Sequence, residues 1–449
     1  MNMKRNAAML AGTITLFGTI LSGCGGGGTV GQPAGQSAGQ AAGQSAAAEK
    51  NSKPYAGTTL RLVTANHAWT DLIKPKIPEF EQQTGIKVNL ESYFEDQLTQ
   101  KLTVEFTSGS SSVDVFMMRP LQEGKMFIQN GWVGEMTKKD DPDWDFKDFT
   151  NASTGSLIQG GKLYGVPIVT EREILYYRKD ILEKNNIPVP KTLDELKQAA
   201  AKLNDPNNGF YGFVARGQRA AAVTQFSSFL YGMGGDFMKD GKATIDTPEA
   251  VSAFKTYGEL LKSYGPPGVL NMSWPQAIGI FGQGKAAFYT DADSLYPNLL
   301  DPQKSSVGDK TGFALFPAGS KGQTPYNVTS WSLAIQAKSK NQAAAWEFVK
   351  WATSKQAMTA LQGKGIPGPR QSVWNTDEGK KSFPPELVNV ISKSNELGKA
   401  YDRPILINVG EARDVIGSVI VTAISGEDVE KAAKQANQQF QAIIDKEKK

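Results

Sequence analysis

Hydrophobic and polar residues follow short, regular patterns in the first third of the folded part of the chain. Residues 58–63, 86–90 and 113–117 each carry the alternation or the short apolar run of a β-strand. Between them, residues 72–80 and 97–106 place large apolar side chains at helical spacing. The order strand, helix, strand, helix, strand predicts a parallel sheet flanked by helices.

Later segments carry patterns of the same kinds. Residues 286–289 form an apolar run typical of a strand, and residues 331–335 alternate between apolar and small polar side chains. From residue 427 onward, apolar residues recur at helical spacing, which predicts a C-terminal packing helix. We expect two further helices to begin near Gln225 and at Trp274.

The loops after the first three strands are where we expect function. In an open parallel sheet, ligands bind where the carboxyl ends of the strands meet the loops. These loops are residues 64–69, 91–96 and 118–120. Their polar and aromatic candidates are His67, Trp69, Glu95, Asp96 and Arg119.

The first 24 residues have the pattern of a bacterial lipoprotein export signal. Two basic residues precede an apolar run over residues 7–21, which is shorter than the ~20 residues of a membrane-spanning helix. Residues 21–24 at the end of this run have the sequence LSGC, which resembles the lipobox at which a diacylglycerol thioether forms on the cysteine. We therefore predict a signal peptide over residues 1–23 and a lipid on Cys24. An ordinary secretory signal is the alternative.

A segment without bulky apolar residues follows the predicted lipid site. Residues 25–54 are mostly Gly, Gln, Ala and Ser, a composition that buries too little apolar surface to fold. We predict that residues 24–57 are the lipid anchor and a flexible tether. The rest of the chain is long enough for two domains at roughly 100–200 residues per domain.

Composition excludes several kinds of site. The chain has one cysteine and one histidine among its 449 residues. With Cys24 bearing lipid, there is no disulfide, thiolate zinc site or cysteine nucleophile, and His67 alone cannot supply two imidazole ligands. The formal net charge of +4, with basic residues scattered along the chain, argues against a nucleic-acid partner. We expect no metal and no cofactor.

Six segments, in their order and spacing, resemble the family 1 extracellular solute-binding proteins. They are PEFE at 78–81, TGIKV at 84–88, FTSG at 106–109, DVF at 114–116, YGVPI at 164–168 and LYYRKD at 175–180. Members of this family are capture subunits of ABC sugar importers, and maltose-binding protein is a distant relative. The resemblance covers nearly the whole chain from residue 58 to 449.

The resemblance implies an α/β, periplasmic-binding-protein-like fold of two lobes, each a mainly parallel sheet flanked by helices, with a ligand cleft between them. The chain would cross between the lobes near Pro167, Pro317 and Gly368, where a bend interrupts a strand-like run. The expected lobe 1 is residues 58–167 plus 318–368. The expected lobe 2 is residues 168–317 plus 369–449.

The same resemblance implies a function and partners. The chain would capture a sugar or sugar alcohol and deliver it to the permease of an ABC transporter, without catalysis and as a monomer. A lipid-tethered form fits the extracellular face of the cell membrane of a Gram-positive bacterium, which has no outer membrane to retain a free binder.

In lobe 1, the resemblance places the strand-end candidates in the cleft. Structural roles stay open: Trp69 could anchor the start of a helix, Asp96 could cap one, and Arg119 could form a surface salt bridge. Trp331 joins this set, although its alternation could equally turn it toward the core.

In lobe 2, the candidates lie on several segments, and Glu171 is the preferred contact with sugar hydroxyls. Trp274 could pack in the core, and so could one of the two adjacent tyrosines, Tyr176 and Tyr177. The candidates are Glu171, Tyr177, Gln225, Trp274, Arg403 and Arg413. Either arginine could instead support a loop.

Asp291 and Asp293 depart from the family pattern. They follow the strand over residues 286–289, at a place where the family has an aromatic stacking residue. An acid there trades ring stacking for hydroxyl bonding, which suits a small ligand with many hydroxyl groups. Three alternatives remain open. They are a surface glycosidase using Glu171 and Asp291, the same fold holding a small organic anion on Arg119 and Arg403, and a lipoprotein adhesin or receptor sensor that binds a protein.

Overall fold

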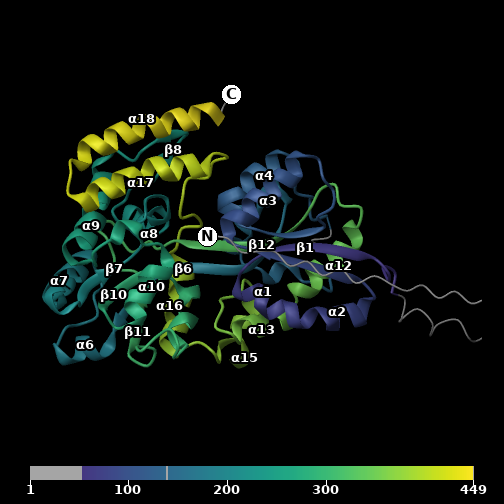
Figure 1. Cartoon of the computed structure of the whole chain (residues 1–449), viewed down its shortest axis with the longest axis horizontal. Helices are drawn as coiled ribbons and strands as arrows, with labels where there is room; N and C mark the ends of the chain where they lie inside the picture. The colour runs from purple at the N-terminus through teal and green to yellow at the C-terminus, as the bar shows by residue number, and fades with distance from the viewer. Residues whose placement is uncertain (1–52, 138–139, 448–449) are drawn as a thin grey trace, which may run out of the picture. The chain divides into compact units, whose positions relative to one another are not determined.

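The structure, a computed structural model, describes residues 53–137 and 140–447 (Figure 1). The predicted signal peptide, Cys24 and nearly all of the tether lie outside these residues. None of the helices in the described part of the chain has both the length and the apolar character needed to cross a bilayer.

An eight-stranded mixed sheet runs through the folded body. Its strand order is β2-β1-β3-β12-β6-β10-β7, and β11 pairs with β6 beside this path. The strands are β1 (Thr59–Ala65), β2 (Lys87–Tyr93), β3 (Val115–Met118), β6 (Val166–Arg178), β7 (Tyr211–Val214), β10 (Ala286–Ala292), β11 (Thr311–Leu315) and β12 (Asn327–Ile335). Two short hairpins stand apart, β4 (Ile158–Gln159) with β5 (Lys162–Leu163) and β8 (Met238–Lys239) with β9 (Lys242–Ala243).

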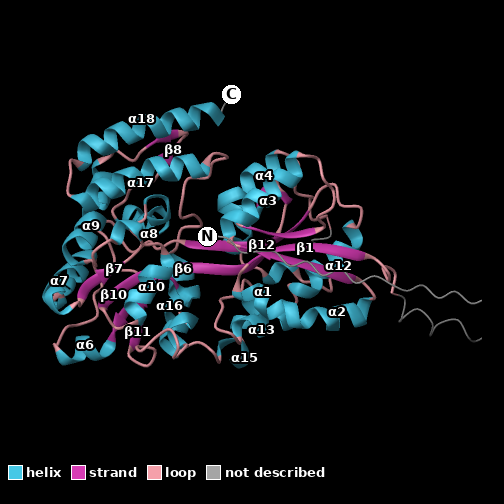
Figure 2. Cartoon of the chain, viewed as in Figure 1, coloured by secondary structure: helices cyan, strands magenta, loops and turns pink. Residues whose placement is uncertain are grey.

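The parallel strands lie in two separate halves of the sheet. β1 pairs in parallel with β2 and β3, and β10 pairs in parallel with β7. This confirms the parallel arrangement that the strand–helix pattern predicts for the first three strands. The link between the halves is antiparallel: β6 pairs with β12 over its first part and with β10 and β11 over its second part. Figure 2 shows β6 and β12 running between two groups of helices.

One half of the sheet is covered by helices from two separate segments of the chain, residues 68–154 and residues 342–380. They are α1 (Ala68–Ile73), α2 (Ile77–Thr84), α3 (Glu95–Thr107), α4 (Lys125–Gln129), α5 (Asn151–Thr154), α12 (Gln342–Ala352), α13 (Lys355–Gln362), α14 (Gln371–Trp374) and α15 (Asp377–Lys380). The amphipathic helix predicted before Gly85 forms as two helices joined by a 3₁₀ turn at residues 74–76. Gly85 ends α2 at a φ of 75°, a conformation that a residue with a Cβ rarely adopts.

The other half is covered by the remaining helices. They are α6 (Lys179–Lys184), α7 (Leu193–Leu203), α8 (Arg219–Gly232), α9 (Pro248–Tyr264), α10 (Trp274–Gly282), α11 (Pro297–Leu300), α16 (Pro385–Leu397), α17 (Val409–Ser425) and α18 (Val429–Glu447). Helix α8 is buried from Ala222 to Gly232 because α9 and α17 pack against it, and Phe226 of α8 stacks on Phe254 of α9 at 4.1 Å. The prediction that this helix begins near Gln225 is wrong, since α8 begins at Arg219.

The apolar core divides along the same lines. One cluster joins residues 60–169 to residues 331–373. The second half holds two clusters, a larger one that runs from Leu175 to Ile444 and a smaller one that includes Tyr289 and Leu387. Separate cores on either side of β6 and β12 are what a two-lobed α/β body requires, and the predicted fold class is confirmed.

Candidate ligand-binding cleft

A cavity of about 790 Å³ is lined by side chains from both halves of the body. Its walls include many of the predicted site residues. They are His67, Glu95, Asp96, Arg119, Glu171, Trp274, Trp331, Arg403 and Arg413. The volume is within the usual range for a pocket that takes a small molecule. The strand-end loops of β1, β2 and β3 meet here, as the parallel-sheet rule predicts.

Arg119 lies at the carboxyl end of β3 and is tied to acidic side chains on two elements. Its Nε donates to Glu123 Oε2 at 3.2 Å, and its Nη1 donates to Glu95 Oε2 at 3.2 Å. The guanidinium carbon lies 5.6 Å from the centre of the Trp331 ring. Burial disfavours the charge on Arg119, but Glu123, Glu95 and Asp96 outweigh it and raise its pKa. Arg119 therefore stays a fixed cation in the wall.

Glu95 and Asp96 belong to the first turn of α3, at the rim. The Asp96 side chain is 91 % exposed, and its Oδ1 lies 3.7 Å from Arg119 Nη2. The alternative that Asp96 caps the helix does not hold, because the N-cap is Phe94 and no side-chain capping bond forms there. Both carboxylates face solvent and the cavity together, so a ligand can reach them.

His67 and Trp331 form one aromatic side of the cavity. The two ring centres lie 5.8 Å apart, and the Trp331 side chain is nearly buried. Nδ1 of His67 accepts a hydrogen bond from the backbone N–H of Trp69 at 3.0 Å and caps α1. Burial lowers the pKa of His67 to about 4, so the ring is neutral near pH 7. With Nδ1 accepting, the proton of the neutral ring is on Nε2, which serves as a donor.

Glu171 lies in β6, where the strand passes from one half of the sheet to the other. Its Oε1 accepts a hydrogen bond from Ser294 Oγ at 2.7 Å. Burial raises the pKa of Glu171 to about 7, although the bond from Ser294 works in the opposite direction. Near neutral pH this side chain can thus either accept or donate a hydrogen bond, which matches a hydroxyl group.

Arg216, which was not predicted, follows β7 at the carboxyl end of the strand and lines the cavity. Its Nε donates to Asp291 Oδ2 at 2.9 Å, and its Nη2 donates to Asp291 Oδ1 at 2.5 Å. Burial disfavours the charge, but Asp291 outweighs it and raises the pKa of Arg216. The strand-end rule used for β1 to β3 would have found this arginine had it been applied to residues 211–216.

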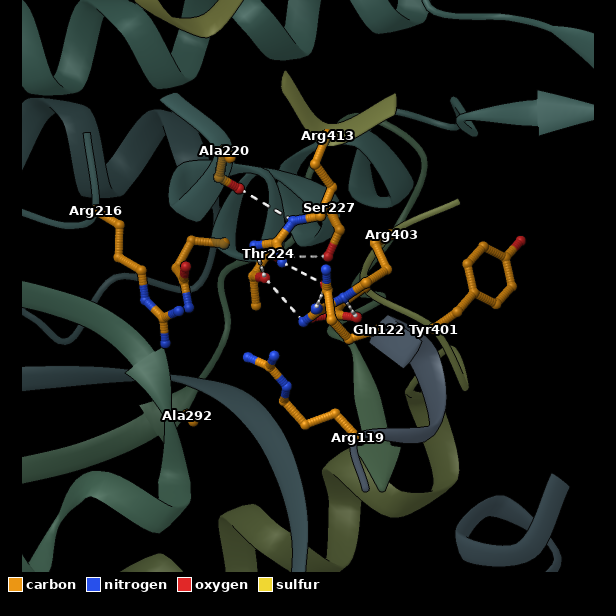
Figure 3. A network of polar contacts seen from close by, with 12 residues as sticks. Arg119, Gln122, Arg216, Ala220, Thr224, Ser227, Ala292, Tyr401, Arg403 and Arg413 are labelled. Atoms are coloured by element: carbon orange, nitrogen blue, oxygen red, sulfur yellow. Dashed lines mark hydrogen bonds and ion pairs between the residues drawn. The ribbon is translucent and has the colours of Figure 1, made fainter. Parts of the chain in front are cut away.

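A network of polar contacts closes one end of the cavity (Figure 3). Gln122 Oε1 accepts from Arg403 Nη1 at 2.7 Å and from Arg413 Nη1 at 2.8 Å. Thr224 Oγ1 accepts from the Nη2 atoms of the same two arginines at 3.2 and 3.3 Å. Arg403 also forms an ion pair with the buried Asp402. Burial and the charge of Arg403 lower the pKa of Arg413.

Five predicted site residues do not line the cavity. Asp291 and Gln225 are fully buried behind Arg216, where Gln225 Nε2 donates to Asp291 Oδ1 at 2.8 Å. Asp293 is buried and pairs with Arg172 at 2.7 Å. Strand β10 continues to Ala292, three residues past its predicted end, so Asp291 lies in the strand rather than in a loop. These side chains position the wall and do not face a ligand.

The remaining two of the five serve the core. Trp69 is fully buried in the cluster around residues 60–169, as the packing alternative for it predicts. Tyr177 lies near the end of β6, far along the strand from Glu171, and its hydroxyl donates to Glu386 Oε1 at 2.8 Å. Trp274 has both roles, because it lines the cavity and also packs against the smaller core cluster of the second half.

Several polar lining residues were not anticipated. They include Asn66, Asp71, Gln122, Arg216, Arg219, Thr224, Ser294, Asn298 and Lys304. Most are neutral donors and acceptors in loops or first turns, which a single sequence does not distinguish from solvent-facing positions. Within residues 53–137 and 140–447, no group of His, Cys, Asp and Glu is arranged to hold a metal ion. The cleft is equipped for hydrogen bonding to a polar small molecule.

Comparison with known proteins gives a consistent result. Residues 66–359 match the family model described as bacterial extracellular solute-binding protein. The chain is 28% identical to the erythritol/L-threitol-binding protein of Mycolicibacterium smegmatis over 83% of this chain and 82% of that one. It is 28% identical to the mannitol-binding protein of Pseudomonas aeruginosa over 72% of this chain and 74% of that one.

A solved structure extends the likeness to three dimensions. The ABC transporter solute-binding protein from Agrobacterium radiobacter K84, in complex with ribitol, superimposes with a TM-score of 0.78 at 29% identity. The match covers 87% of this chain and 99% of that chain. Two lobes, a polar cleft between them and a family model that matches most of the chain lead to one conclusion: this chain belongs to the bacterial extracellular solute-binding protein family.

Proposed function

We propose that this protein captures a sugar or sugar alcohol in the cleft between its lobes and delivers it to the permease of an ABC importer. The observation that carries the proposal is the pairing of charged hydrogen-bonding groups with aromatic rings around one cavity. Relatives are named for binding erythritol, L-threitol and mannitol, and a related structure holds ribitol.

The chemistry of the walls suits a chain or ring of hydroxyl groups. Each hydroxyl both donates and accepts, so it can bond to a guanidinium on one side and a carboxylate on the other. Arg119, Arg216, Glu95 and Glu171 offer both kinds of partner, and bonds to charged groups are the stronger ones. The ring of Trp331 supplies a surface against which the C–H face of a sugar can pack.

Binding without catalysis accounts for the site better than hydrolysis does. The glycosidase alternative needs a second carboxylate beside Glu171, about 5–10 Å away across the scissile bond. Asp291, the residue predicted for that role, is fully buried and engaged with Arg216 and Gln225. Family members are binding proteins. A fold of two lobes can close around a ligand and open again to release it.

We further propose that residues 1–23 direct export, that Cys24 carries the lipid, and that the tether holds a monomeric binder at the outer face of the cell membrane. This part rests on the sequence pattern of the first 57 residues. A tether raises the effective concentration of the binder at a membrane permease.

Isothermal titration calorimetry tests the binding proposal. The purified body should bind at least one member of a panel of alditols, monosaccharides and oligosaccharides. The variant Arg216→Gln should weaken that binding by about tenfold or more, because a charged donor is removed from the wall. Lys197→Gln, which removes an exposed ion pair with Glu259, is the control and should bind like the parent protein. No binding to any member of the panel would refute the proposal.

A further inference from the structure

Four half-buried guanidinium groups line the cleft, and three of them have a buried carboxylate behind them. Arg119 is backed by the buried Glu123, Arg216 by Asp291, and Arg403 by Asp402. Arg413 is the fourth. Its three hydrogen bonds go to Ala220 O at 3.1 Å, Gln122 Oε1 and Thr224 Oγ1, all of them neutral oxygens. No carboxylate of the described residues forms an ion pair with it.

Arg413 is also held beside another cation. It shares the Gln122 and Thr224 oxygens with Arg403, so the two guanidinium groups lie against each other. Two like charges in contact inside a wall are costly unless an anion compensates them. Asp402 forms a two-point ion pair with Arg403 and also attracts Arg413, so one carboxylate serves two guanidinium groups and one positive charge is left over.

The unbalanced charge faces the ligand space. Arg413, Arg403, Arg119 and Arg216 all line the cavity. Figure 3 shows Arg119 extending toward the Arg403–Arg413 pair. Arg413 has N–H groups left over after its three bonds, because a guanidinium carries more donors than these bonds use.

The acids at the cavity do not cancel this charge. Glu95 is 45 % exposed and Asp96 is 91 % exposed, so water and salt screen them, and both are already directed to Arg119. Glu171 accepts from Ser294, and burial raises its pKa to about 7, which reduces its negative charge near neutral pH. Asp71 and Asp414 also line the cavity, and Asp414 is paired with Arg219.

We propose that the ligand is a sugar acid, a polyhydroxylated molecule with one carboxylate, and that this carboxylate binds at Arg413. This inference rests on the proposed function, and it narrows the substrate class within it. The carboxylate of such a ligand would lie beside Arg403 and Arg413. Its hydroxyl groups would extend toward Glu171 and toward Glu95 and Asp96 at the rim. The ligand's carboxylate supplies the one negative charge that Arg403 and Arg413 lack when Asp402 is counted as their only buried carboxylate.

Calorimetry on matched pairs tests the substrate class. Each pair has the same carbon chain with and without the carboxylate: ribonate against ribitol, gluconate against glucitol, and glucuronate against glucose. The acid of at least one pair should bind about tenfold or more tightly than its neutral partner, and this ratio should fall as salt is raised to about 0.5 M. Equal or weaker binding of the acid in every pair overturns the inference.

Variants of Arg413 test whether its charge causes the preference for the acid over the neutral ligand. Arg413→Gln should bring the acid-to-neutral ratio close to one, whereas Arg413→Lys should keep part of it because the charge remains. Lys197→Gln should leave the ratio unchanged. The ratio is taken on one protein at a time, so a partly unfolded variant does not distort it. If the neutral members bind and the acids gain nothing, the proposed function stands and this inference falls; if no member binds, both fall.

Discussion

Arginine side chains in the cleft keep their positions because buried carboxylates hold them from behind. Arg216 is the clearest example, since Asp291 occupies two of its nitrogens and is itself fully buried. Asp291 also accepts from Gln225, so its own position is fixed. A side chain that is pre-ordered in this way loses little conformational freedom when a ligand binds. Residues that never touch the ligand thus determine how well it is held.

A double-mutant cycle at Arg216 and Asp291 measures this support. Asp291→Asn leaves the Arg216 charge buried without its partner, and it should lower the free energy of unfolding by about 3–5 kcal/mol. The double variant with Arg216→Gln should lose clearly less than the sum of the two single losses. Guanidinium unfolding followed by circular dichroism gives these values. The exposed Lys197–Glu259 pair is the control, with an expected coupling below about 1 kcal/mol. Additive losses at Arg216 and Asp291 would contradict the expected support.

Glu171 makes stability depend on pH in a defined direction. Its pKa rises from 4.5 in a free side chain to about 7 in the fold, so above pH 7 the folded protein holds a disfavoured charge that the unfolded chain tolerates. Below about pH 4.5 the group is neutral in both states and this cost is absent. Glu171→Gln should therefore be more stable than the parent by about 1–3 kcal/mol at pH 8, and the gain should shrink toward pH 4.5.

Denaturation at the two pH values checks the Glu171 prediction. The surface substitution Glu259→Gln serves as the comparison, because that carboxylate is 45 % exposed. A gain for Glu171→Gln that is the same at both pH values would show that the charge is not its cause. The same substitution should also weaken ligand binding, since Gln cannot carry the charge that strengthens bonds to hydroxyl groups.

The accuracy with which site residues can be predicted from the sequence depends on how well the ends of the strands and helices are predicted. Arg119 was found because β3 ends at Met118, one residue past its predicted end. Glu95 was found because it still follows β2, although β2 runs to Tyr93, three residues past its predicted end. Asp291 was misplaced because β10 runs three residues further than its apolar run, so a residue expected in a loop lies in the sheet. Gln225 was misplaced because α8 begins at Arg219 and buries it. The fold class needs only the order of elements, whereas a contact residue must also lie outside the strand or helix as it forms in the structure.

Helices α8 and α17 form the element pair on which the arginine end of the cleft depends. Helix α8 carries Thr224, and α17 carries Arg413. The two helices approach closely at Gly417, where an added Cβ would lie 2.1 Å from the backbone oxygen of Arg219. A side chain at this position would force the helices apart and separate Arg413 from the Thr224 oxygen. The glycine therefore sets the spacing of the site.

Gly417→Ala should lower the free energy of unfolding by about 1–3 kcal/mol and weaken ligand binding together. Gly279→Ala is the matched control, because Gly279 is also inside a helix but nothing lies within 4 Å of an added Cβ. That control should be neutral or stabilising by up to about 1 kcal/mol, with unchanged binding. Denaturation and calorimetry on both variants are the measurements. Equal stability for the two would mean that α17 shifts without cost.

At the scale of the whole molecule, we expect the described body and the predicted anchor to have separate roles. The body from residue 53 onward contains the cavity and both lobes, whereas the lipid site predicted at Cys24 lies outside the described residues. Capture should depend only on the body. Transport should depend on both, because a permease in the membrane gains from a binder held nearby.

Cys24→Ser therefore separates the two parts. The variant should be released from the cell and bind ligand with the affinity of the parent protein, while ligand uptake falls. Fractionation, calorimetry and uptake of labelled ligand are the three measurements. Unchanged uptake would show that the anchor does not contribute to transport, even if export still follows the predicted route.

Strand β6 has a consequence for how such proteins diversify. It pairs with β12 in one half of the sheet and with β10 and β11 in the other. Each half of the sheet therefore includes part of the same thirteen-residue strand. A whole lobe cannot be exchanged between paralogues without rebuilding this shared strand. The loops at the strand ends carry no such burden and can be replaced one at a time. Ligand preference can therefore change through single loops while the shared strand stays as it is.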